Sequence, residues 1–76
     1  MELKNRILII DYNDVDTIIY HLNDGKSSKD AAKILFNISP QFEEIITEVE
    51  ISAPSSDNNR KNVEMAISAI KSYLNI

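Results

Sequence analysis

Apolar residues recur at the spacing of an α-helix in four separate segments, and this repetition constrains the fold more than any other feature. The first segment runs from Asn13 to Asn23, with Asn13 as the expected N-cap and Gly25 just beyond the expected end. Asp14 and Asp16 lie in its first turn, where the positive end of the helix dipole favours carboxylates. Its apolar stripe consists of Val15, Ile18, Ile19 and Leu22. We therefore predict a helix over this segment.

The next two segments each open with a capping residue. Ser27, with Asp30 three residues later, has the form of a capping box, and Ser39-Pro40 places a capping serine before a proline. The two apolar stripes are Ala31, Ile34, Leu35 and Ile38, and then Phe42, Ile45, Ile46 and Val49. We predict one helix from Ser27 or Ser28 and a second from Ser39 to about Val49.

A polar stretch over residues 52–62 predicts an exposed loop that leads into a last helix, with Ser56 or Asp57 as its cap. The stripe of this helix is Val63, Ala66, Ile67, Ile70 and Leu74. A chain of 76 residues is enough for one domain. The sequence therefore predicts a single all-α domain over residues 1–76, a small bundle of three to four short helices.

The segment Ile45–Ile51 also supports a different fold. It is rich in β-branched residues, and Thr47, Val49 and Ile51 alternate with two glutamates, which is typical of a half-buried strand. Such a strand could pair with Arg6–Ile10. The alternative is therefore an α+β domain with a short two-stranded element from residues 6–10 and 45–51.

Few residues of this chain could carry catalytic or metal-binding chemistry. It has no cysteine, one glycine and a single histidine, His21, which we interpret as a surface or helix-end residue. We therefore expect no enzyme activity, no cofactor and no metal site. The apolar run Ile7–Ile10 is shorter than the roughly 20 residues of a membrane span or the about 7–15 of a signal peptide core. These features favour a cytoplasmic protein.

The charge of the chain indicates the kind of partner. Its net charge of −4 argues against binding nucleic acid or an anionic membrane surface, because both are recognised by Lys and Arg. The stretch Ile34–Asn59 contains no Lys or Arg but holds Asp57 and four glutamates: Glu43, Glu44, Glu48 and Glu50. We predict that these four residues bind a basic protein, one candidate being a nuclease, and that Asp14 and Asp16 form a second acidic patch.

Short pieces spread over most of the chain resemble the immunity proteins of nuclease colicins and pyocins. They are Met1–Asn5, Asp11-Tyr12, Phe42-Glu43-Glu44, Pro54-Ser55, and Ile67, Ile70, Lys71 and Tyr73. The resemblance implies a four-helix protein that binds its cognate nuclease toxin and blocks access to DNA. It also implies that Glu43, Glu44 and Asp30 set the specificity for the toxin. Where the family has paired tyrosines before the proline, this chain has Ser52-Ala53.

The predicted function is an acidic protein-binding domain that neutralises a nucleic-acid-processing enzyme, either as an immunity-like protein or as a phage-type inhibitor that imitates the charge of DNA. One alternative is a degenerate helix-turn-helix regulator over Ser28–Ile46, although Gln41-Phe42-Glu43-Glu44 would turn carboxylates toward phosphates. Another is a helical structural module that self-associates through residual apolar surface such as Ile7–Ile10.

Overall fold

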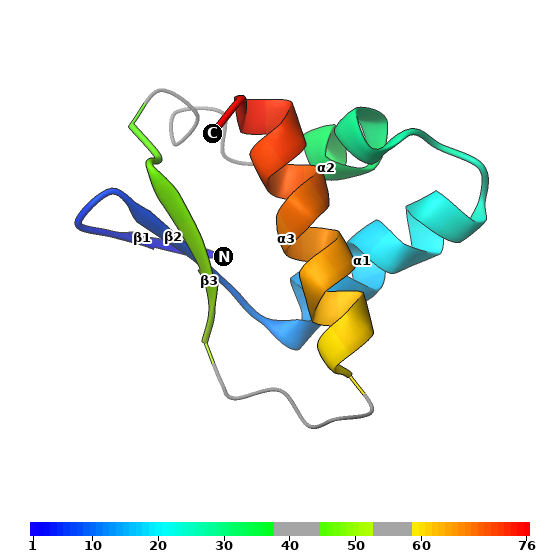
Figure 1. Cartoon of the computed structure of the whole chain (residues 1–76), viewed down its shortest axis with the longest axis horizontal. Helices are drawn as coiled ribbons and strands as arrows, with labels where there is room; N and C mark the ends of the chain where they lie inside the picture. Colours follow the sequence, from blue (N-terminus) through cyan, green and yellow to red (C-terminus); the bar gives the residue numbers. More distant parts are fainter. Residues whose placement is uncertain (38–44, 53–58) are drawn as a thin grey trace.

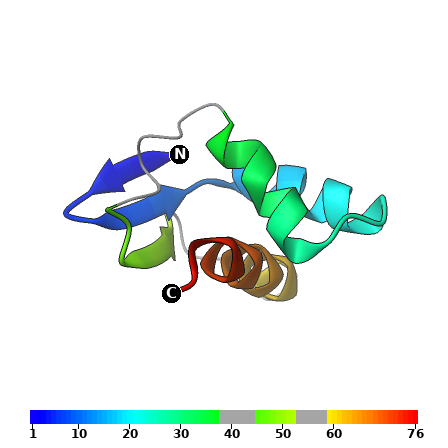
Figure 2. The same ribbon diagram turned by 90° about the horizontal axis from the view of Figure 1, so that it is seen from above.

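In the computed structural model, which describes residues 1–37, 45–52 and 59–76, three helices pack on one side of a three-stranded sheet (Figures 1 and 2). The elements in chain order are β1 (Glu2–Lys4), β2 (Ile7–Ile10), α1 (Tyr12–Asn23), α2 (Ser28–Phe36), β3 (Glu48–Ile51) and α3 (Arg60–Leu74). The domain is therefore α+β, and the prediction of an all-α bundle is wrong.

The sheet has the strand order β1-β2-β3. β1 and β2 form an antiparallel hairpin whose two turn residues, Asn5 and Arg6, have φ angles of 52° and 66°. Positive φ at both central residues is the geometry that matches the right-handed twist of a two-residue hairpin. β3 then pairs with β2 in parallel, after the chain has passed through α1 and α2. A local turn thus makes the first pairing, whereas the second joins segments about 40 residues apart.

The helix predicted from Ser39 to about Val49 is wrong where the structure describes it, because Ile45–Thr47 are not helical and Glu48–Ile51 is a strand. In this strand Val49 is buried at 4% exposure, whereas Glu48 and Glu50 are exposed. The apolar residues at positions 42, 45, 46 and 49 have the spacing of a helix. The alternation over residues 47–51 nevertheless predicts the observed structure, because this segment pairs with β2 as a strand. The α+β alternative identified the two segments that pair as β2 and β3, but it extended the second over residues 45–47, which are not in the strand, and it missed β1.

The remaining helices are close to their predicted positions. α1 begins at Tyr12 and not after Asn13, since Asp11 and Asp14 form a reciprocal capping box: the Asp14 N–H donates to Asp11 Oδ1 (2.9 Å) and the Asp11 N–H to Asp14 Oδ2 (3.1 Å). α2 begins at Ser28, as predicted, with Ser27 Oγ accepting from the Asp30 N–H at 3.2 Å. The caps predicted for the last helix, Ser56 and Asp57, lie outside the described residues, and α3 begins at Arg60 with Asn59 before it.

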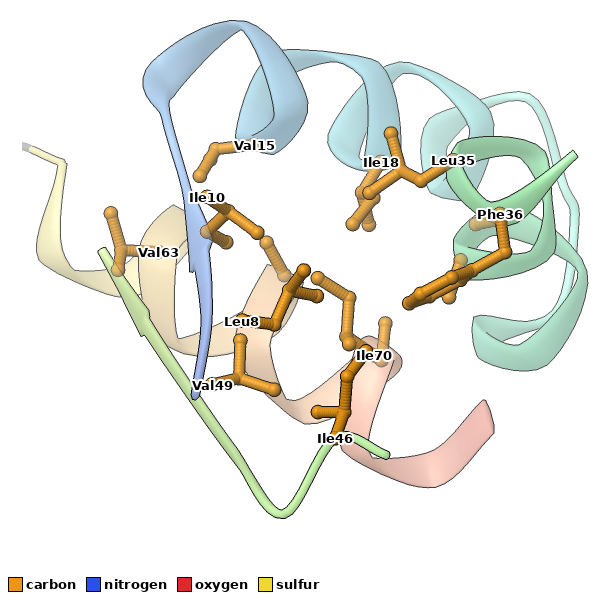
Figure 3. Packing of buried hydrophobic residues seen from close by; sticks show 14 residues of the cluster. Leu8, Ile10, Val15, Ile18, Leu35, Phe36, Ile46, Val49, Val63 and Ile70 are labelled. Atoms are coloured by element: carbon orange, nitrogen blue, oxygen red, sulfur yellow. The ribbon is translucent and has the colours of Figure 1, made fainter. Parts of the chain in front are cut away.

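The core fills the space between the sheet and the three helices (Figure 3). Leu8 and Ile10 enter it from β2, Ile18 from α1, Phe36 from α2 and Ile70 from α3, all with 0% exposure. Phe36 stacks on Tyr73 of α3, with the ring centroids 5.2 Å apart. Four buried alanines of α2 and α3 complete the core: Ala31, Ala32, Ala66 and Ala69.

The capping box predicts a specific dependence of stability on pH. The pKa of Asp11 is held below its ordinary value, mainly because its carboxylate accepts the Asp14 backbone N–H. The stability it contributes is therefore present above the ordinary Asp pKa of about 4 and is lost as the pH falls through the lower folded-state pKa. Asp11→Ala should cost about 0.5–2 kcal/mol at neutral pH.

Urea unfolding followed by circular dichroism, at neutral pH and near pH 2, measures this effect. The free-energy difference between the wild type and Asp11→Ala should shrink in acid. Asp11→Asn is the matched control, because asparagine caps helices about as well as aspartate but does not titrate. A difference that stays constant from neutral to acid pH would show that ionisation of the Asp11 carboxyl does not contribute to the stability of α1.

Candidate partner-binding surface

The two faces of the sheet differ in what covers them. The row Leu3–Leu8–Val49 and the pair Ile10–Ile51 face the helices. The opposite face carries the rows Glu2–Ile9–Glu50 and Lys4–Ile7–Glu48, because side chains alternate along each strand. We call these six residues the outer face. The three helices lie on the other side of the sheet (Figure 2), so no described helix or strand covers the outer face.

The outer face has an apolar centre and a charged rim. Ile7 and Ile9 of the central strand are half-buried, and the four residues that flank them are exposed: Glu2, Lys4, Glu48 and Glu50. Three glutamates and one lysine therefore flank the two isoleucines. An apolar centre inside a polar rim is the usual anatomy of a protein interface.

Glu48 is the most constrained of the three carboxylates. Its Oε1 accepts the backbone N–H of Val49 at 3.0 Å and lies 3.1 Å from the Nζ of Lys71 on α3. The Val49 N–H, and after it the Lys71 ammonium, hold the pKa of Glu48 below its ordinary value. Glu48 is thus ionised at neutral pH, with its charge already balanced by Lys71.

Glu2 and Glu50 are different, because they lie in one row on either side of Ile9 and are both exposed. Within the described part of the chain, neither carboxylate forms an ion pair. With Glu48 balanced by Lys71, these two carboxylates outnumber the single Lys4 ammonium and give the outer face its net negative charge. Glu2 was missed from the sequence, although the alternation Glu2-Leu3-Lys4 beside the apolar run of β2 is a weak strand signal.

The structure does not bring the other predicted acidic residues to this face. Asp14 is part of the capping box and lies 3.4 Å from the N-terminal amine, so its role is structural. Asp16 is exposed on α1 and Asp30 is exposed in the first turn of α2. Glu43 and Glu44 lie outside the described residues. Of the predicted set, only Glu48 and Glu50 are shown to share a surface.

The remaining features show no reactive constellation in the described ranges 1–37, 45–52 and 59–76. No group of three His, Asp or Glu residues there could hold a metal ion, and no helix there is long and apolar enough to cross a membrane. His21 is half-buried and edge-on to Tyr20, and its buried Nδ1 has no hydrogen-bond partner among those residues. His21 lies in the last turn of α1, so the interpretation as a helix-end residue is confirmed, whereas a fully exposed surface position is not.

Two shallow hollows of about 500 and 480 Å³ adjoin on the exposed side of α3 and share Glu64 and Ser68. Their walls mix both signs of charge with serines and a few apolar side chains.

The second helix of the proposed helix-turn-helix was expected to run through Ile46, but Ile45–Thr47 are not helical. Neither the two hollows nor the proposed helix-turn-helix segment forms a site as well defined as the outer face.

Comparison with protein-family models, with curated proteins and with solved structures found no match. The class of the protein is therefore described by its fold and surface: a small α+β domain with three helices on one face of a mixed three-stranded sheet and an acidic opposite face. The four-helix fold implied by the resemblance to immunity proteins does not hold for this chain.

Proposed function

We propose that this chain is a protein-binding domain that takes a basic partner on the outer face of its sheet. The observation that carries the proposal is the half-buried pair Ile7 and Ile9, which no described helix or strand covers, inside an exposed carboxylate rim. Burying the isoleucines would contribute a favourable term of roughly 25 cal/mol per Å² of apolar surface, from which the entropic cost of association is subtracted. Glu2 and Glu50 would steer a positively charged partner and set its orientation.

The narrower form of the proposal is an inhibitor of a nucleic-acid-processing enzyme. Such enzymes carry Lys and Arg at the surface that binds phosphates, and a compact acidic face can occupy that surface in place of nucleic acid. The net charge of −4 supports this choice of partner over nucleic acid itself. Immunity-like and DNA-mimicking inhibitors are both members of this class.

The test is capture of partners from the lysate of the native host by three tagged forms of the full chain. These are the wild type, the double variant Glu2→Lys/Glu50→Lys, and the matched control Asp16→Lys/Asp30→Lys, which makes the same change in net charge elsewhere. We expect a basic protein to be retained by the wild type and the control. Reversing the charge of the rim should lower its association rate by about 10-fold or more at low salt.

Quantitative mass spectrometry and surface plasmon resonance with the purified partner provide the readout. Binding should weaken in about 0.5 M salt, where the Debye length is roughly 4 Å. Inhibition of the captured enzyme's activity by the purified chain would support the narrower form. Equal retention by all three forms, or equal loss from both double variants, would refute the outer face as the binding site.

A further inference from the structure

The free edge of β3 offers backbone hydrogen-bond donors next to the outer face. β3 is the last strand in the order β1-β2-β3, so no described strand pairs with its other edge. Ser52 directs its N–H toward β2, donating to the carbonyl of Ile10 at 2.8 Å. Because successive amides of a strand point to opposite sides, the amides of Val49 and Ile51 point away from β2, toward this edge.

Glu48 covers one of these donors. The N–H of Val49 donates to Oε1 of Glu48, and the same oxygen lies 3.1 Å from the Nζ of Lys71. Proteins often protect an exposed strand edge with charged side chains, because unpaired N–H and C=O groups attract other strands. Here the cover is an exposed side chain held by one exposed ion pair, and such pairs contribute little, about 0.2–1 kcal/mol. An incoming strand could therefore replace the carboxylate with a backbone carbonyl.

The charges of β3 indicate which strand fits. If two copies of β3 paired, Glu48 and Glu50 of one copy would lie beside the same residues of the other, and opposed like charges destabilise a strand pair. A strand with Lys or Arg at every second position would instead place its cations on the outer face. These cations would lie beside Glu50 and the displaced Glu48, so the charge pattern selects a basic extended segment over a second copy.

We infer that the partner adds an extended basic segment to the free edge of β3 as a fourth strand, displacing the Glu48 carboxylate from the Val49 N–H. This inference rests on the proposed function, because the added strand would extend the same outer face. It specifies the mode of binding: backbone pairing with Val49 and Ile51, and recognition of charge by Glu48 and Glu50.

The experiment titrates the ¹⁵N-labelled full chain with a defined probe, the blocked peptide acetyl-Lys-Val-Lys-Val-Lys-Val-amide. The control is the same peptide with every backbone nitrogen methylated, which keeps its charge but cannot pair as a strand. We expect the unmethylated peptide to shift the amide signals of Val49 and Ile51 and to slow their hydrogen exchange. The methylated peptide should do neither.

A second comparison tests whether the Glu48 carboxylate competes with the peptide for the Val49 N–H. Lys71→Met releases Glu48 from its ion pair and should tighten binding of the unmethylated peptide by about 2- to 5-fold, the range expected for one exposed ion pair. Lys61→Met is the matched control, since it removes an equal charge from the exposed first turn of α3, away from the Glu48–Lys71 pair. It should leave the affinity unchanged or raise it much less.

Three outcomes would overturn the inference. Equal binding of both peptides would mean that charge alone attracts them, and no binding of either would mean that the edge is closed to a basic strand. Protection of the Val49 amide without peptide, together with a dimer in sedimentation, would identify a second copy as the occupant. The proposed function would still stand in each case if Glu2→Lys/Glu50→Lys loses the captured partner and Asp16→Lys/Asp30→Lys does not.

Discussion

Phe36→Ala is expected to destabilise this protein more than any other single truncation of a side chain. Phe36 is the largest fully buried side chain in the described part of the chain, with 0% exposure, and it stacks on Tyr73. Removing a buried phenylalanine ring costs about 3–5 kcal/mol, partly through lost burial and partly through the cavity that remains. A chain of this length has a total stability of only about 4–11 kcal/mol. The variant should therefore be close to unfolding at room temperature.

The position of Phe36 explains why the loss cannot be absorbed locally. It is the last residue of α2, and its ring contacts α3 near the end of that helix. The packing of α2 on α3 would therefore loosen as a unit.

Urea unfolding followed by circular dichroism measures the effect. Phe36→Leu is the control, because leucine refills much of the volume and should cost clearly less than alanine. If Phe36→Ala lowers the free energy of unfolding by under about 1 kcal/mol, then Phe36 is not at the centre of the core, since buried phenylalanine truncations cost several times more.

Leu8→Ala is the second large expected effect, at about 2–5 kcal/mol. Leu8 has 0% exposure and lies in the middle of the inward row between Leu3 and Val49. The neighbouring Ile9 points to the outer face and is only half-buried, so Ile9→Ala should cost less than half as much. The comparison of two adjacent apolar residues therefore tests the strand alternation directly.

Guanidinium unfolding of both variants, analysed by linear extrapolation, gives the two free energies. Equal costs for Leu8→Ala and Ile9→Ala would contradict the assignment of one residue to the core and the other to the surface. They would also remove the apolar centre of the proposed binding face, since Ile9 would then be a core residue.

Sequence reasoning predicted the local structure well where the signals are local. The stripe of α1 and the Ser27 cap of α2 both depend on residues within one or two turns, and both are present. The start of α1 was misjudged by two residues because Asp11 and Asn13 are both good capping residues. Both also have an aspartate three residues later, Asp14 and Asp16, so the spacing does not distinguish them, and the structure shows that the reciprocal box forms between Asp11 and Asp14.

The candidate surface was predicted only in part. Glu48 and Glu50 were identified, but on a helix and in the company of Asp14, Asp16 and Asp30, which lie elsewhere. Glu2 joins the surface through the pairing of β1 with β2 and of β2 with β3. No local pattern relates residue 2 to residue 50, so a reading of one sequence could not place them in the same row.

By itself, the sequence determined the helices α1, α2 and α3, the apolar residues that they bury and the acidic character of the surface. These features follow from periodicity, capping and composition, which act over a few residues. Only the tertiary structure decided that residues 48–51 form a strand and that their glutamates flank Ile7 and Ile9. Val49 suits the apolar face of a helix or of a strand equally well, and hydrogen bonding to β2, far away in the sequence, determines which one forms.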